Sequence, residues 1–210
     1  MIAMAPDIAP ATLAEPHERY RTILLFGAPG AGKGTVGKAL GAIPGFVHCA
    51  CGDVFRTMDL TSPIGKVFLD YSSRGLLVPD DTTIALWKES IDGFVTTHRF
   101  QPERDLLVLD GIPRNAAQAE IMDSYIQVEH IFHLVCLDED LMMARLRRRA
   151  LKENRLDDAS EDVIRRRWQV YEEESRAVLA HYPADVVKRI DAAGSPIKVL
   201  HQMLGHLLTA

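Results

Sequence analysis

Cysteine and excess positive charge are both scarce in this sequence. Only three of the 210 residues are cysteine, at 49, 51 and 136, which is too few for a disulfide framework and suits a reducing cytoplasm. Cys49 and Cys51 could ligate a metal, but no second pair completes such a site, and we expect small buried side chains at the end of a strand. The formal net charge of −5 argues against nucleic acid as a partner, because nucleic-acid binders usually present a net basic face.

A basic leader and a long apolar run are also missing from the N-terminal region. Residues 1–20 hold three prolines among alanines and acidic residues, so they support neither a signal peptide nor a membrane anchor. We therefore expect a flexible extension ahead of one domain over residues 21–210, and no membrane partner. The hydrophobic content of 47% is typical of a folded soluble protein.

The strongest pattern is a glycine-rich loop, residues 27–35, that directly follows the apolar run 22–26 and precedes a helix-compatible segment. The four glycines of this loop have no Cβ atom, so the backbone can take positive φ there and turn its N–H groups around anionic oxygens. The next helix adds partial positive charge, and the lysine adds a full charge. The pattern predicts binding of a nucleoside polyphosphate by Gly30, Ala31, Gly32, Lys33, Gly34 and Thr35.

The rest of the chain alternates between apolar runs and helix-like stretches. The runs 106–109 and 131–137 are almost continuously apolar, as in parallel strands that are buried on both faces, and 186–190 is a further candidate. Helix-like patterns cover 33–41, 63–74, 80–97, 115–126, 139–152, 161–181 and 195–208. The predicted fold class is α/β: a P-loop doubly wound parallel sheet flanked by helices, with the ligand at the carboxyl ends of the strands.

Four segments together resemble the short-lid adenylate kinases of the nucleoside monophosphate kinase family. In that family a glycine follows the lysine of the loop, as it does here. The segment from Cys51 to Arg56 resembles the family's threonine-glycine-aspartate segment, with Cys51 in the threonine's place. The family's aspartate-glycine-phenylalanine-proline-arginine signature resembles Asp110, Gly111, Ile112, Pro113 and Arg114, followed by Gln118. Its arginine ladder is similar to Arg145, Arg149, Arg155 and Arg167, with the pair Asp157 and Asp158 between.

The resemblance implies reversible, Mg²⁺-dependent transfer of the γ-phosphoryl group of ATP to AMP by a monomer, giving two ADP. It implies a helical acceptor-binding insertion at about residues 50–79 and a short lid at about 149–158. The catalytic residues would be Lys33, Asp110, Arg114, Arg155 and Arg167, and Asp110 would hold the metal through water. Arg145 and Arg149 would join the loop in binding ATP. AMP would be bound by Cys51, Arg56, Leu76, Leu77, Val78, Gly111, Arg114, Gln118, Arg155 and Arg167.

Physical chemistry agrees with these roles. Asp110 follows a buried strand, so its carboxylate should emerge beside the phosphate loop. Phosphoryl transfer spreads negative charge, which planar guanidinium groups pair with bidentately. Only five residues separate Arg149 from Arg155, so the lid is too short for a cysteine-bound zinc, and it has no cysteine. Asp158 and Glu161 could also cap the helix that follows, which is compatible with contacts in the lid.

Three alternatives remain open. The acceptor could be UMP or CMP: Gln118 favours adenine, since a pyrimidine-specific relative typically has asparagine there, but the Cys51 thiol is a weak donor where the family has a hydroxyl. The chain could be a nucleotide-binding regulator without turnover, although the complete set of charged residues argues against it. Finally, one extra residue after Asp158 leaves either Arg166 or Arg167 as the last active-site arginine.

Overall fold

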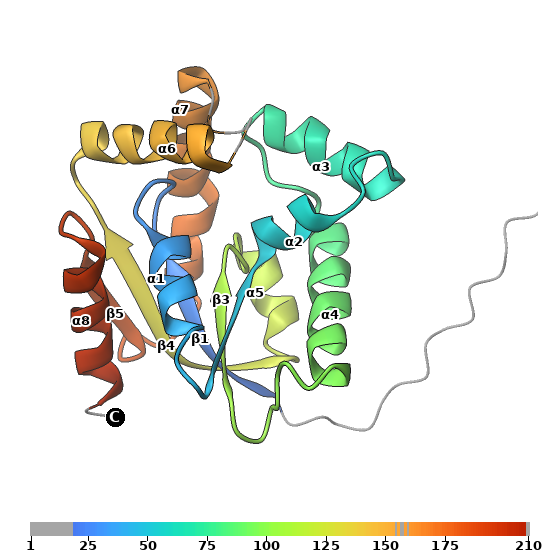
Figure 1. Ribbon diagram of the computed structural model, residues 1–210, viewed down its shortest axis with the longest axis vertical. Coiled ribbons are helices and arrows are strands. Elements are labelled where there is room, and N and C mark those ends of the chain that lie inside the picture. Colours follow the sequence, from blue (N-terminus) through green and yellow to red (C-terminus); the bar gives the residue numbers. More distant parts are fainter. Residues whose placement is uncertain (1–18, 154, 156–157, 159, 209–210) are drawn as a thin grey trace, which may run out of the picture.

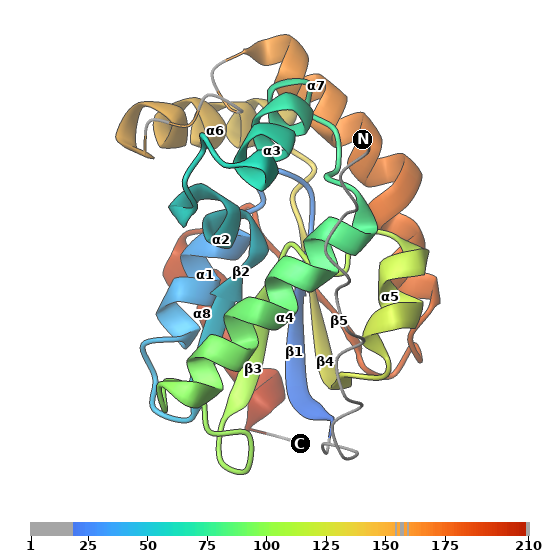
Figure 2. The ribbon, with the colours of Figure 1, turned by 90° about the vertical axis from the view of Figure 1, so that its right-hand side faces the viewer.

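The protein is built on a five-stranded sheet, all of whose pairings are parallel, with helices on both faces (Figures 1 and 2). The computed structural model describes residues 19–153, 155, 158 and 160–208. The strand order is β2-β3-β1-β4-β5, where the strands are β1 (Tyr20–Phe26), β2 (Phe46–Ala50), β3 (Leu106–Asp110), β4 (Ile126–Val135) and β5 (Val187–Asp191). The predicted doubly wound α/β fold is confirmed. The strand β2, at one edge, had no predicted range.

The helices follow the predicted stretches closely, with three differences. They are α1 (Lys33–Leu40), α2 (Cys51–Thr57), α3 (Pro63–Ser73), α4 (Asp80–Thr96), α5 (Ala116–Met122), α6 (Glu139–Glu153), α7 (Glu161–Val170) and α8 (Pro196–Leu207). The helix α2 had no predicted range of its own within the helical insertion. The predicted helix 115–126 ends early because β4 begins at Ile126, and the predicted helix 161–181 divides. After α7 comes a π-helical turn, Tyr171–Ser175, and then a 3₁₀ turn, Arg176–Ala180. Within the described residues, no helix has the length and apolarity needed to cross a membrane.

The two faces of the sheet build two separate cores. Successive side chains of a strand point to opposite faces, and β1 is apolar at both. Ile23 and Leu25 join a cluster with residues of α1 and α8, whereas Leu24 and Phe26 join a larger cluster with residues of α4 and α5. All four β1 side chains are at most 5% exposed. This double burial explains why the central strands read as continuous apolar runs.

The segments with the predicted ligand residues gather at one end of this sheet. The carboxyl ends of parallel strands share one edge, where loops of different origin meet. In Figure 1, α6 and α3 lie beyond that edge, and α2 lies between α3 and the sheet. The predicted lid joins α6 to α7, but residues 154, 156, 157 and 159 lie outside the described part. So does nearly all of the predicted extension, residues 1–20.

Candidate active site

The loop between β1 and α1 has positive φ angles at three of its four glycines. Gly27, Gly30 and Gly32 have φ values of 145°, 89° and 102°. A Cβ atom at Gly27 would come within 2.5 Å of the Leu134 carbonyl oxygen, and one at Gly30 within 2.8 Å of the Met142 carbonyl oxygen. Glycine is therefore required at both positions by torsion angle and by space.

Gly34 does not take the positive φ that a glycine allows. This residue lies inside the first turn of α1, where the backbone is helical. A Cβ atom here would lie 3.5 Å from Oδ2 of Asp110, so the carboxylate that ends β3 sits against the start of α1. No side chain caps this helix at Gly32. The first N–H groups of α1 therefore have no side-chain cap to compete with an anion.

The Lys33 side chain folds over the loop that precedes it. Its Nζ donates to the carbonyl oxygens of Gly27, at 2.6 Å, and Ala28, at 3.3 Å. Burial is the main cause that lowers the pKa of the Lys33 ammonium to about 8. The Asp110 carboxylate acts to raise this pKa, and nearby arginines act to lower it. A charge that is costly to maintain in the free protein becomes favourable once a polyanion arrives.

Asp110 and Arg114 lie on the turn after β3. Asp110 pairs in register with Leu25 of β1, directly before the phosphate loop. The Arg114 Nε donates to the Gly111 carbonyl oxygen at 2.9 Å, which keeps the guanidinium beside this turn. Among the described residues, no three His, Cys, Asp or Glu side chains are grouped so that they could hold a metal ion by themselves.

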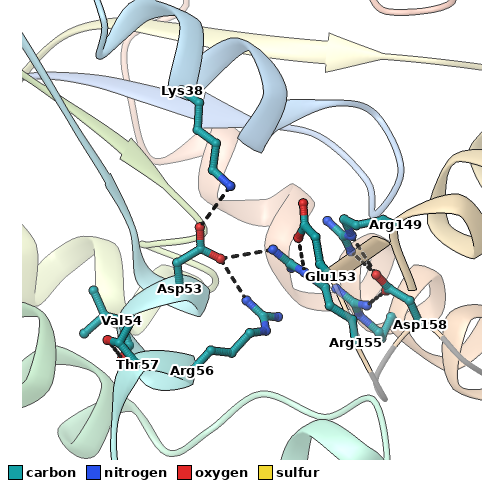
Figure 3. A network of polar contacts seen from close by, with 10 residues as sticks. Lys38, Asp53, Val54, Arg56, Thr57, Arg149, Glu153, Arg155 and Asp158 are labelled. Carbon is teal, nitrogen blue, oxygen red and sulfur yellow. Dashed lines mark hydrogen bonds and ion pairs between the residues drawn. The ribbon is translucent and has the colours of Figure 1, made fainter. Parts of the chain in front are cut away.

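Asp53 of α2 connects the predicted lid to the acceptor-binding insertion (Figure 3). Its Oδ1 accepts hydrogen bonds from Arg155, at 3.0 Å, and from Arg56, at 3.2 Å. Its Oδ2 lies 3.7 Å from the Lys38 Nζ, and Arg155 also donates to Glu153 at 2.6 Å. Sequence reasoning missed Asp53, although it is the aspartate of the segment that resembles the family's threonine-glycine-aspartate motif.

Asp158 joins two of the predicted phosphate-binding arginines. It is fully buried, it accepts from the Arg149 Nε at 2.6 Å, and it forms an ion pair with Arg167. The predicted capping role is wrong, because the N-cap of α7 is Ser160 without a side-chain cap, and Asp158 is committed to the arginines. Arg166 instead donates to Gln169, at 2.7 Å on the exposed side of α7.

Two further contacts fasten α6 and α7 to the core. Arg145 donates to the carbonyl oxygens of Ala192, at 2.9 Å, and Gly194, at 3.1 Å, in the turn between β5 and α8. The indole Nε1 of Trp168, next to Arg167 in α7, donates to the Pro29 carbonyl oxygen in the phosphate loop at 2.9 Å. The helix with the last arginine is thus hydrogen-bonded directly to the loop.

One cavity of about 600 Å³ unites these features. Every residue that the sequence predicted for the site lines it, from Gly30 to Thr35 in the loop to Arg167 in α7. Cys51 is buried there, and burial raises the pKa of its thiol to about 11. Gln118 is only 1% exposed. Other lining residues were not predicted, among them Asp53, Phe55, Phe68, Tyr171, Ala192, Gly194, Pro196 and Val199, together with the exposed Arg148 and Lys152.

Comparison with known proteins gives one consistent result. A family model described as adenylate kinase matches residues 25–187. The chain is 33% identical over 185 residues to an adenylate kinase of Thermus thermophilus, across 85% of this chain and 92% of that protein. It is 34% identical over 187 residues to an adenylate kinase of Thermobifida fusca, across 86% and 94% of the two chains. The match extends beyond the loop, from the end of β1 to the start of β5, so the chain belongs to the adenylate kinase family of phosphotransferases.

Proposed function

We propose that this protein transfers the γ-phosphoryl group of ATP to AMP, giving two ADP. The observation that carries the proposal is the single cavity that contains both the phosphate loop and the helical insertion around α2 and α3. Two nucleotides meeting end to end need such a shared space, because direct transfer requires the donor and acceptor oxygens to be in line. The relatives described above, from Thermus thermophilus and Thermobifida fusca, are named adenylate kinases.

The loop end of the cavity would hold ATP. The uncapped N–H groups at the start of α1 and the positive end of that helix suit the β- and γ-phosphates. The Lys33 ammonium would exchange its two carbonyl partners for phosphate oxygens, which adds a full charge where negative charge develops. Arg145 and Arg149, on α6, would lie over the donor nucleotide from the lid.

Asp110 fits a Mg²⁺ ion that arrives with the nucleotide. Its carboxylate lies against the first turn of α1, and a hard oxygen ligand beside phosphate oxygens is the donor set that Mg²⁺ prefers. Since one carboxylate is too few for a protein-only site, the phosphates and water would complete the coordination. When bound, the ion would neutralise charge on the β- and γ-oxygens.

The insertion, about residues 50–79, would hold AMP. Arg56 and Arg114 would bind the acceptor phosphate, and the backbone and side chains of Leu76, Leu77 and Val78 would line the base. Gln118 would read the base edge with its amide. Arg155 and Arg167 would contact the transferred group, since both line the same cavity as the phosphate loop and the insertion.

The mechanism needs no covalent intermediate. The acceptor oxygen attacks the γ-phosphorus directly while the arginines stabilise the spread charge. Closing the short lid, about residues 149–158, would exclude water, which otherwise competes as an acceptor. We further propose that the protein acts as a monomer in the cytoplasm. Three free cysteines, two of them buried, are consistent with a reducing compartment.

An acceptor panel tests the reaction. ADP formation is measured with ATP and each of AMP, CMP, UMP and GMP, and AMP should give the highest kcat/KM by at least about tenfold, because each correct base hydrogen bond contributes about 1 kcal/mol. A higher value with CMP or UMP would replace the proposal by the pyrimidine alternative. ATP binding without any transfer would favour a non-catalytic regulator.

Matched variants test the assigned residues. Lys33→Met should lower kcat by roughly 10²–10³-fold, as for other groups that stabilise developing charge, while Lys66→Met, on the exposed side of α3, should not. Arg167→Ala should lower kcat by about 10³-fold, while its neighbour Arg166→Ala stays active. The reverse result for the arginines would move the assignment to Arg166.

A further inference from the structure

The side-chain amide of Gln118 is held at both of its ends. Its Oε1 accepts a hydrogen bond from the backbone N–H of Arg114 at 2.8 Å. Its Nε2 donates to Oδ1 of Asp80 at 2.7 Å. Asp80 is the first residue of α4 and follows the stretch expected to line the acceptor base. The contact therefore crosses from α4 to the start of α5, two helices that lie on the same face of the sheet (Figure 2).

Asp80 is itself fixed by a second amide. The Asn115 Nδ2 donates to both oxygens of Asp80, at 3.0 Å and 3.2 Å. The Asn115 Oδ1 accepts from the backbone N–H of Gln118 at 2.8 Å and so caps α5. Carboxylate, cap and amide thus form a closed network, in which each group limits the rotation of the next.

Chemistry allows only one orientation of the Gln118 amide in this network. A carboxylate can only accept hydrogen bonds, so the group that faces Asp80 must be the NH₂. A backbone N–H can only donate, so the group that faces Arg114 must be the carbonyl oxygen. Rotation of the amide by 180° would set oxygen against carboxylate and NH₂ against N–H, which breaks both hydrogen bonds.

The fixed amide keeps one N–H and one oxygen lone pair for a ligand, because each end has one hydrogen bond within the protein. Adenine offers a complementary pair of groups on its base-pairing edge: N1 accepts and the N6 amino group donates. Guanine has the opposite order, since its O6 accepts and its N1–H donates. An amide that could rotate would suit either purine, whereas an amide with one orientation suits only one.

We propose that Asp80 is a positioning residue that sets the purine specificity of the acceptor site. It does not contact the substrate; it holds Gln118 in the orientation that accepts adenine and opposes guanine. This inference rests on the proposed function, in which the acceptor is AMP and Gln118 lies at the base. It adds a residue of α4 to the determinants of specificity.

The test is the ratio of kcat/KM for AMP to kcat/KM for GMP. A ratio measured on one preparation does not depend on the folded fraction, so a loss of stability alone leaves it unchanged. Asp80→Ala should lower the ratio by about tenfold or more, as expected for loss of one hydrogen bond to a charged group. Asp80→Asn, whose oxygen can still accept from Gln118, should restore the ratio to within about threefold of the wild type.

The matched control is Asp81→Ala. It removes the same charge from the same first turn, but its carboxylate accepts only from its neighbour Thr82 among the described contacts. Its ratio should equal that of the wild type. In a Gln118→Met background, Asp80→Ala should leave the ratio unchanged, because the amide that it orients is gone. Should Asp80→Ala fail to fold, Asp80→Ser replaces it, since serine favours a helix start and is too short to reach Gln118.

The outcomes separate this inference from the proposed function. If the wild type prefers AMP but Asp80→Ala and Asp81→Ala show the same ratio, the role of Asp80 is refuted and the function stands. If Asp80→Ala lowers the ratio equally in the Gln118→Met background, Asp80 acts by another route and the inference is wrong. A wild type that prefers a pyrimidine nucleotide overturns both.

Discussion

Raising the pH above 8 should weaken ATP binding because Lys33 loses its charge. In the free protein, burial of this ammonium lowers its pKa to about 8. Binding of a polyphosphate requires the charged form, so protonation promotes binding and affinity falls as the pH rises. The nucleotide itself does not interfere, since its terminal phosphate has a pKa of about 6 and is already ionised.

The size of the effect follows from the fraction of charged Lys33. With a pKa of about 8, about 90% of the molecules are charged at pH 7 and about 10% at pH 9. Because apparent affinity scales with the competent fraction, the Kd for ATP should rise about tenfold over this range. Binding at pH 9 should also take up close to one proton, since the phosphates restore the charge of Lys33.

Titration calorimetry measures both quantities, the proton uptake coming from buffers of different ionisation enthalpy. Lys33→Arg is the matched control, since a guanidinium stays charged throughout and its affinity should be independent of pH. An equal decline in Lys33→Arg would assign the pH dependence to another group. A Kd for the wild type that is constant from pH 7 to pH 9 would refute the lowered pKa.

Three further predictions follow from contacts in the cavity. Asp158→Asn should lower the free energy of unfolding by about 3 kcal/mol, because two partly buried arginines lose their shared, buried counter-ion, and ATP should raise Tm more in this variant than in the wild type; an equal ATP effect would contradict it. Trp168→Phe should lower kcat and abolish the change in tryptophan fluorescence on ATP binding, because the Trp168 indole contacts the phosphate loop. The Trp87→Phe variant should keep this fluorescence change; the reverse result would mean that Trp87 is the tryptophan that responds to ATP. Cys51→Thr should lower the KM for AMP by about 2–10-fold through a new hydrogen bond, whereas Cys49→Ala should not; no change would mean that Cys51 does not contact the base.

Three of the four strands that the sequence predicted, β1, β3 and β4, lie inside the sheet, and the fourth, β5, is an edge strand. The strands β3 and β4 are covered by helices on both sides, so their apolar residues run on without interruption. The edge strand β2 has the alternating exposure of half-buried residues, with Val47 and Cys49 buried and His48 between them less so. Five residues with that pattern do not distinguish a strand from a loop, which is why β2 had no predicted range.

The division of the helix after Ser160 could not be predicted from periodicity. Residues 161–181 keep a helical pattern, but the chain changes to a π-helical turn at Tyr171–Ser175. There the Tyr171 hydroxyl forms a hydrogen bond with the His133 imidazole, at 3.0 Å, from the neighbouring β4. This hydrogen bond joins residues that are 38 positions apart in the sequence. The hydrophobic pattern of residues 161–181 contains no information about such a distant contact. Such single π turns are frequent near functional sites.

Motif residues were easier to place than their partners. Their position follows from parallel strands, whose carboxyl ends meet at one edge, so every predicted site residue lies along the same cavity. The partner of an arginine depends on which carboxylate the completed fold brings near. Arg155 pairs with Asp53 across 102 positions of sequence, and the sequence contains 29 acidic residues that could have competed. Only the tertiary structure identifies the one that lies within reach.

These carboxylates also explain how a protein with a net charge of −5 can bind two polyanions. Arginines crowded into one cavity repel one another, so the free protein needs counter-ions among them. The Asp158 carboxylate forms ion pairs with Arg149 and Arg167. The Asp53 carboxylate forms ion pairs with Arg56 and Arg155. Phosphate oxygens offer the same charge and the same planar, bidentate match to guanidinium. If these arginines bind phosphate as we propose, nucleotide binding would exchange one set of anionic partners for another, and the acidic residues would act as counter-ions in the free protein.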